Sequence, residues 1–145
     1  MIGVGPATVV GRYIEECWNR GRIDLVDELV DAAFIDHLPF EAHLPDGING
    51  LKSMIEHARR GFGDFHIDVE DMIAEDDRVV TRFLLRGTHD GPFIGLMPSH
   101  RQAQVEGIAI FRVEHHQIVD QWCMIDRNRF MRQLGVGEEF LVLQQ

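Results

Sequence analysis

Apolar residues recur at helical spacing in three stretches of the first half of the chain. A period near 3.6 places them on one stripe, with polar residues largely off it, which is typical of amphipathic helices. The stripes are formed by Val10, Ile14, Cys17 and Trp18, by Leu25, Val26, Leu29 and Val30, and by Leu51, Met54, Ile55 and Ala58. We therefore predict helices over residues 7–19, 24–30 and 49–60.

The period changes from about 3.6 to 2 near residue 65, and the alternation predicts strands over residues 65–72, 78–88, 101–114 and 117–126. Turns are expected at Asp76-Asp77 and at residues 114–117. The second and third strands flank the run Gly87-Thr88-His89-Asp90-Gly91-Pro92-Phe93-Ile94-Gly95. This run cannot continue a ladder, because Pro92 has no N–H to donate. We therefore expect these two strands to be antiparallel neighbours.

Helices followed by antiparallel strands predict an α+β domain, with the helices packed on one face of the sheet. Alternation assigns to this inner face Val79, Thr81, Phe83, Leu85, Val105, Gly107, Ala109, Phe111, Val119, Gln121, Cys123 and Ile125. The outer face carries Arg82, Arg86, Glu106, Arg112, Asp120, Ile108, Ile110, Trp122 and Met124. Because an exposed Trp beside aliphatic side chains indicates a partner surface, we predict a homodimer through Ile108, Ile110, Trp122 and Met124.

Small residues occupy the middle of the third predicted strand at Gly107 and Ala109. Glycine weakens a strand and leaves space above it. Two interpretations stay open: a cavity between sheet and helices, or a glycine bulge that bends the sheet.

Composition and charge exclude several classes of function. A chain of 145 residues with 45% apolar content predicts one domain over residues 1–145. The formal net charge of -10, with Lys52 as the single lysine, argues against a nucleic-acid partner. No apolar run approaches the roughly 18 residues of a membrane span, and Met1–Gly11 is a poor signal peptide. Cys17 and Cys123 indicate no disulfide framework, so we expect a reducing, cytoplasmic location without a membrane partner.

Cofactor and metal motifs are not found either. No pair of histidines has the helical spacing with a carboxylate that a zinc site needs, and there is no glycine-rich phosphate loop or nucleophile elbow. We expect neither metal nor cofactor.

Several short motifs occur in the order and spacing of SnoaL-like polyketide cyclases. They are Trp18-Asn19-Arg20-Gly21, Asp36-His37-Leu38-Pro39, the run from Gly87 to Gly95, Ile110-Phe111-Arg112-Val113, and Ile118-Val119-Asp120-Gln121-Trp122 with Asp126. The chain resembles this family from about residue 7 to residue 135. The resemblance implies a cone-shaped α+β domain of the nuclear transport factor 2-like superfamily. It also implies a cofactor-free lyase or isomerase that cyclises, isomerises or hydrates a hydrophobic cyclic or polyketide-like substrate in a pocket between helices and sheet.

The residues that the family uses for catalysis are replaced in this chain. The resemblance implies an inward Asp on the last strand and a His on the strand before it, at the positions of Cys123 and Ala109. A family Gln corresponds to Gly107. Two alternatives to an enzyme of altered chemistry therefore remain: a non-catalytic domain that binds a hydrophobic ligand or forms a dimeric scaffold, and a protein-binding module that uses Trp122.

The candidate catalytic residues are His37 and Asp126. His37 lies in the segment that typically enters the cavity in such domains, and imidazole titrates near neutrality, so it is the acid/base candidate. Asp126 either holds His37, holds Arg129 or caps the following helix. The residues expected to line the pocket are Tyr13, Trp18, Met54, Phe83, Gly107, Ala109, Gln121 and Cys123.

Three other polar residues have two interpretations each, and a pair of histidines has one. Gln121 either orients a ligand carbonyl or hydroxyl or satisfies a loop backbone, and Cys123 is either a nucleophile or a small buried hydrophobe. His89 is expected on a rim loop, as a gate or as part of the turn. His115-His116 are expected at an exposed hairpin tip.

Overall fold

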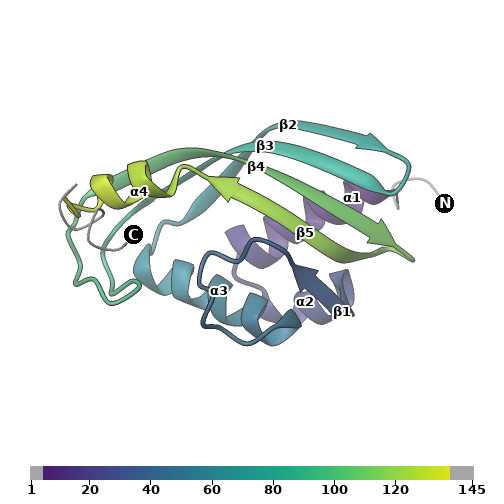
Figure 1. The fold of residues 1–145 in the computed structure, drawn as a ribbon, viewed down its shortest axis with the longest axis horizontal. Coiled ribbons are helices and arrows are strands. Elements are labelled where there is room, and N and C mark those ends of the chain that lie inside the picture. Colours follow the sequence, from purple (N-terminus) through teal and green to yellow (C-terminus); the bar gives the residue numbers. More distant parts are fainter. Residues whose placement is uncertain (1–4, 138–145) are drawn as a thin grey trace.

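Five strands form one sheet, with helices against one of its faces (Figure 1). The computed structural model describes residues 5–137, so the first residues of the Met1–Gly11 segment lie outside the described part. The strands are β1 (Val30–Asp36), β2 (His66–Glu75), β3 (Arg78–Thr88), β4 (Gln102–Glu114) and β5 (Gln117–Ile125). Their order is β1-β5-β4-β3-β2, with β1 parallel to β5 and the other neighbours antiparallel.

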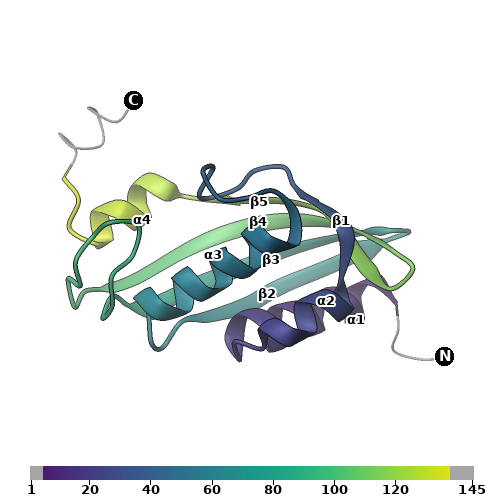
Figure 2. The same cartoon turned by 90° about the horizontal axis from the view of Figure 1, so that it is seen from below.

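The predicted helices are all present. They are α1 (Pro6–Arg12), continued by the π-helix η1 (Tyr13–Asn19), the 3₁₀ turn η2 (Ile23–Leu25) with α2 (Val26–Leu29), and α3 (Gly47–Gly61). A short helix, α4 (Arg127–Gln133), follows β5. Figure 2 shows α1, α2 and α3 on the same side of the sheet, and α4 beyond the end of β5. The predicted α+β architecture is confirmed.

The strand β1 was not among the predicted strands. Its hydrogen-bond partner β5 lies more than eighty residues later, where Asp36 pairs in register with Gln121. Parallel pairing of this kind needs a long crossover connection, so local alternation does not reveal it. The other strands agree closely with the prediction, and β3 has the predicted limits.

The two predicted turns and the antiparallel pairing of β3 with β4 are confirmed. His115 and His116 have φ of 50° and 64° at an exposed hairpin tip, and Asp76 has φ of 53°. In the His115-His116 turn both central residues have positive φ, which gives the turn the twist that two-residue hairpins require.

The inner face of the sheet carries the predicted residues of β3 and β4, but β5 departs from strict alternation. The β4–β5 register shifts between Arg112 and Val113, so Ile118 is fully buried and Val119 is only half-buried. A one-residue insertion moves the following side chains to the opposite face. The predicted inward position of Val119 was therefore wrong, whereas Gln121 and Cys123 lie where alternation placed them.

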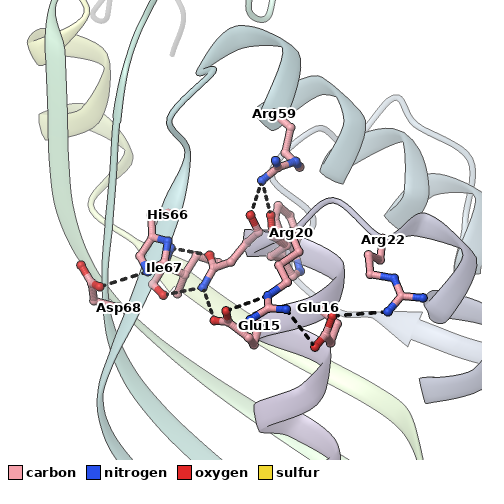
Figure 3. Close-up of polar contacts among 10 residues, drawn as sticks. Glu15, Glu16, Arg20, Arg22, Arg59, His66, Ile67 and Asp68 are labelled. Carbon is pink, nitrogen blue, oxygen red and sulfur yellow. Dashed lines mark hydrogen bonds and ion pairs between the residues drawn. The ribbon is translucent and has the colours of Figure 1, made fainter.

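The end of η1 is fastened to both β2 and α3. The Asn19 side chain donates to the Ile67 carbonyl oxygen at 3.0 Å and accepts from the Ile67 N–H at 2.7 Å. Arg59 of α3 donates to the carbonyl oxygens of Trp18 and Asn19 at 2.9 and 2.7 Å (Figure 3). These bonds satisfy backbone groups at the end of the helix and fix Trp18 beside the sheet.

His89 lies in the connection between β3 and β4, as expected, but it is fully buried, which contradicts its interpretation as a gate. Its ring stacks on Phe62 with centroids 5.4 Å apart, and its Nδ1 lies 2.9 Å from Ser99 Oγ. Burial lowers the pKa of His89, so its ring is neutral at pH 7. The run around His89 is thus packed against the end of α3 rather than projecting as a gate.

Candidate functional site

A cavity of about 320 Å³ lies between the helices and the inner face of the sheet. Its wall is mostly apolar and contains all of the residues expected to line it except Gly107: Tyr13, Trp18, Met54, Phe83, Ala109, Gln121 and Cys123. The loop after β1 adds Leu38, Pro39 and Phe40, and α4 adds Phe130. An apolar cavity with few polar groups is the usual form of a small-molecule site.

Gly107 lies beneath side chains instead of facing the cavity. A Cβ atom there would be 2.4 Å from Phe83 Cζ and 2.8 Å from Ile125 Cγ2. The β3–β4 register shows no shift at this residue, so Gly107 is not a bulge. The expectation that it lines the cavity was wrong, because the space above it is filled by Phe83 and Ile125, which themselves form the wall.

Asp36 is the one carboxylate among the described residues that form the cavity wall. It is the last residue of β1, where it is half-buried beside its register partner Gln121. Burial raises the pKa of Asp36, although a hydrogen bond from the Leu38 N–H and the nearby His37 act in the opposite direction. A carboxyl group with a raised pKa is suited to proton transfer near neutral pH.

Tyr13 and Gln121 form a buried pair in the same wall. The Tyr13 hydroxyl donates to Gln121 Oε1 at 2.9 Å, and the two residues are 1% and 7% exposed. Burial raises the pKa of Tyr13 far above its usual range, so the phenol remains protonated. Because the amide oxygen accepts from Tyr13, the amide nitrogen is the group that Gln121 can offer to a ligand.

Cys123 and Thr81 are the remaining uncharged polar groups of the deep wall. Burial raises the pKa of Cys123 to about 12, so at neutral pH it is a thiol, which is a poor nucleophile. Thr81 is fully buried, and its hydroxyl has no hydrogen-bond partner among the described residues. This geometry favours the interpretation of Cys123 as a small buried hydrophobe.

The structure does not place His37 in the cavity wall. Its ring lies on the outer face of the sheet, where it stacks on Trp122 with centroids 4.4 Å apart and an interplanar angle of 5°. His37 Nε2 is 2.8 Å from Asp120 Oδ1. The expectation that His37 enters the cavity was wrong, since successive side chains of an extended chain point to opposite faces and Asp36 takes the inner one.

Asp126 caps α4. Its carboxylate accepts a hydrogen bond from the Arg129 N–H at 3.0 Å, which confirms the capping alternative, and it is not part of the cavity wall. Asp36 was missed by the sequence analysis although it belongs to the quoted Asp36-His37-Leu38-Pro39 motif. The signal that would have identified it is the strand character of the residues before it.

Residues 5–137 contain neither a metal-binding cluster nor a membrane-spanning helix. No cluster of three or more His, Cys, Asp or Glu side chains has an arrangement that would hold a metal ion. Nor is any helix of this part of the chain long and apolar enough to span a membrane.

Helices across one face of a five-stranded sheet, with an apolar cavity between the two layers, define an α+β domain of the nuclear transport factor 2-like class. Within that class, the family model for SnoaL-like polyketide cyclases matches residues 8–134. The chain belongs to this family.

Known relatives agree with this assignment. The nogalonic acid methyl ester cyclase of Streptomyces nogalater is 27% identical over 119 residues, which cover 81% of this chain and 89% of that protein. The structure of wild-type IdmH from Streptomyces antibioticus has a TM-score of 0.76 at 28% identity and covers 90% of this chain and 99% of its own. A SnoaL-like structure from Jannaschia sp. CCS1 reaches a TM-score of 0.81 at 24% identity, with 91% and 92% covered, and supports the fold.

Proposed function

We propose that this protein is a cofactor-independent cyclase or isomerase that uses Asp36 as its acid/base group on a hydrophobic cyclic or polyketide-like carbonyl compound. The observation that carries the proposal is the single carboxylate among the described residues of a mostly apolar cavity wall, with a pKa raised by burial. Polar groups placed in this way bind the reacting part of a substrate, while the apolar wall binds its rings.

In this proposal Asp36 removes a proton from a carbon atom next to a substrate carbonyl group. The electron pair of that C–H bond becomes the enolate, and its carbon atom attacks a second carbonyl of the same molecule to form the new C–C bond. The second carbonyl oxygen then takes up the proton from Asp36. Substrate and product have the same mass, and Asp36 returns to its starting state.

Gln121 is proposed to bind the carbonyl oxygen that gains charge in the enolate. Its amide nitrogen is free to donate once Tyr13 occupies the amide oxygen. Asp36 and Gln121 are register partners on neighbouring strands, which lie about 4.8 Å apart in a sheet. A carbonyl group and its adjacent C–H can therefore contact both side chains at once, which is the arrangement that enolate formation needs.

The carboxylate in this proposal comes from a different strand than the family resemblance implies. Cys123 and Ala109 are register partners on β5 and β4, so the two positions implied by the family lie side by side without an ionisable carboxyl or imidazole. Asp36 lies on the same face, one strand further toward the edge, beside Gln121. The acid/base group thus approaches the same cavity from β1.

The first test compares Asp36→Asn with the wild type on nogalonic acid methyl ester as the probe. Ring closure is followed by chromatography with mass spectrometry, as a new peak of unchanged mass. We expect the substitution to lower kcat/KM by about 100-fold or more, since general acid/base groups contribute about 10² to 10⁴. The wild-type rate should fall as the pH drops through the raised pKa of Asp36, because only the carboxylate accepts a proton.

Asp24→Asn is the matched control, because Asp24 lies on the surface in an ion pair with Arg22. It should leave kcat/KM unchanged. Wild-type turnover that survives Asp36→Asn would contradict the role of Asp36.

The second candidate function is ligand binding without catalysis, and the residues at positions 109 and 123 favour it. Ala109 and Cys123 replace the His and Asp that the resemblance implies, and burial keeps Cys123 protonated. Binding of the probe without any new peak would establish this alternative.

A further inference from the structure

Asp36 and His37 are neighbours in the chain but lie on opposite faces of the sheet. We propose that His37 is a positioning residue, whose ring is fixed on the outer face by Asp120 and Trp122 and thereby holds Asp36 in the cavity wall. The inference rests on the proposed function, in which Asp36 is the acid/base group.

Three contacts hold His37, the residue after β1, against the neighbouring strand β5. Its ring stacks on Trp122 at 4.4 Å, its Nε2 is 2.8 Å from Asp120 Oδ1, and its backbone N–H donates to the Gln121 carbonyl oxygen at 2.9 Å. The backbone bond extends the parallel pairing one residue beyond Asp36. Because successive side chains along an extended chain alternate between faces, fixing the ring of His37 outside leaves Asp36 only the inner direction.

The two contacts of the ring are themselves held by neighbouring strands. Arg112 of β4 donates from Nε to Asp120 Oδ2 at 2.6 Å, and Asp120 is 8% exposed. Burial alone would raise the pKa of Asp120, but the hydrogen bonds from His37 and Arg112 lower it overall, so the carboxylate stays ionised. The Arg78 guanidinium lies 5.4 Å from the centroid of the Trp122 ring. Together His37, Asp120, Trp122, Arg112 and Arg78 form what we name the outer clamp.

The end of β1 needs such a clamp. β1 is an edge strand with one neighbour, β5, and its register shifts between Val30 and Ile35. The hydrogen bond that Asp36 accepts comes from Leu38, two residues away, and does not tie the strand to the sheet. A carboxylate gains hydration when it leaves an apolar wall, so an unrestrained strand end would let Asp36 turn toward water.

The test measures the pKa of Asp36 by carbon-13 NMR of its carboxyl group, assigned by comparison with Asp36→Asn. The titratable groups that interact electrostatically with Asp36 are Tyr13 from η1, Cys123 from β5 and the adjacent His37. Arg86 and Arg127 also line the cavity, and they are the same in all variants. Burial raises the pKa values of Tyr13 and Cys123, so both stay neutral while Asp36 titrates. His37 is therefore the one titratable side chain of this group that a substitution removes.

In His37→Ala, the direction in which the pKa of Asp36 changes distinguishes a positioning role of His37 from a purely electrostatic one. If the clamp positions Asp36, its loss exposes the carboxyl to water and the pKa of Asp36 falls toward the ordinary aspartate value. If His37 acts only as a nearby positive charge, its removal raises the pKa of Asp36, because imidazolium favours the carboxylate. A rise, or no change, overturns the proposal.

Trp122→Leu is the second variant, and it keeps the imidazole and every charge. We expect it to lower the pKa of Asp36 as well, whereas an unchanged value overturns the role of the stack. It also keeps the proposal testable should His37→Ala fail to fold. His66→Ala is the control, because His66 forms a similar pair with Asp68 at 3.3 Å on the distant edge strand β2 and should leave Asp36 unaffected.

The same titration separates the two proposals. An ordinary pKa for Asp36 in the wild-type protein would count against the proposed function itself. A raised wild-type value that neither substitution changes would overturn only the positioning role of His37.

Discussion

Burial has opposite consequences for two polar side chains in the cavity wall. Asp36 keeps a hydrogen bond from Leu38, and the effect of burial on it is a raised pKa, which is useful for proton transfer. Thr81 cannot change its charge, and its hydroxyl is fully buried without a partner among the described residues. An unpaired buried hydroxyl costs about 1–3 kcal/mol. In this site, therefore, a substitution of Thr81 tests the stability of the fold, and a substitution of Asp36 tests proton transfer.

Thr81→Val is predicted to increase the free energy of unfolding by about 1 kcal/mol, because it replaces the unpaired hydroxyl by a methyl group of similar size. Urea unfolding followed by circular dichroism measures the change. Thr88→Val is the matched control on the same strand, since the Thr88 hydroxyl donates to Asp64 Oδ2 at 2.9 Å. The control should lose stability. A loss of similar size at Thr81 would show that its hydroxyl is hydrogen-bonded.

At the scale of elements, the cavity depends on how the π-helix η1 meets the sheet. Tyr13 begins η1 and Trp18 lies near its end, and both side chains line the cavity. The Arg20 N–H bonds to the carbonyl oxygen of Glu15, five residues earlier, which is the wide turn that defines this helix type. Asn19 and Arg59 then connect its end to β2 and α3. The motif Trp18-Asn19-Arg20-Gly21 thus has a structural role.

Asn19→Ala is predicted to destabilise the protein by about 2 kcal/mol, because two hydrogen bonds to the Ile67 backbone are lost at about 1 kcal/mol each. Thermal and urea unfolding give the value. Asn128→Ala, at an exposed position of α4, is the control and should change stability by less than about 0.5 kcal/mol. Equal effects of the two substitutions would contradict the connecting role of Asn19.

At the scale of the whole molecule, the outer face of the sheet carries apolar side chains that are exposed in the described part of the chain. Ile108, Ile110 and Met124 are 52%, 38% and 68% exposed. Three arginines of this face are paired within the chain: Arg82 with Asp71, Arg86 with Asp68 and Arg112 with Asp120. Such neutralised charges permit close approach of a second copy, so we propose a homodimer through this face.

Ile108→Asp is predicted to convert the dimer to a monomer, because it places an unpaired charge at the centre of the proposed contact. Sedimentation velocity at several concentrations measures the mass in solution. Met97→Asp, at an 80% exposed position in the connection between β3 and β4, is the control and should leave the mass unchanged. A wild-type protein that sediments as a monomer would contradict the proposal.

Periodicity alone predicted most of the elements, and the reason is local. The repeat of apolar residues follows from backbone geometry, so the limits of β3 and the inner positions of Thr81 and Ala109 could be read from the sequence. The single departure within β5 arises from the register shift after Arg112, which depends on how two strands pair. The burial of His89 similarly depends on the packing of a distant residue, Phe62.

Some features of the candidate site were likewise predicted from the sequence, and others depend on tertiary contacts. The sequence by itself determined the family resemblance, the apolar inner face and the motif that contains Asp36 and His37. Which of these two side chains lies in the cavity was decided by the tertiary structure. Parallel pairing with β5 and the contacts of His37 with Asp120 and Trp122 set the face of each residue. Such contacts join residues more than eighty positions apart, and burial, which raises the pKa of Asp36, exists only once they have formed.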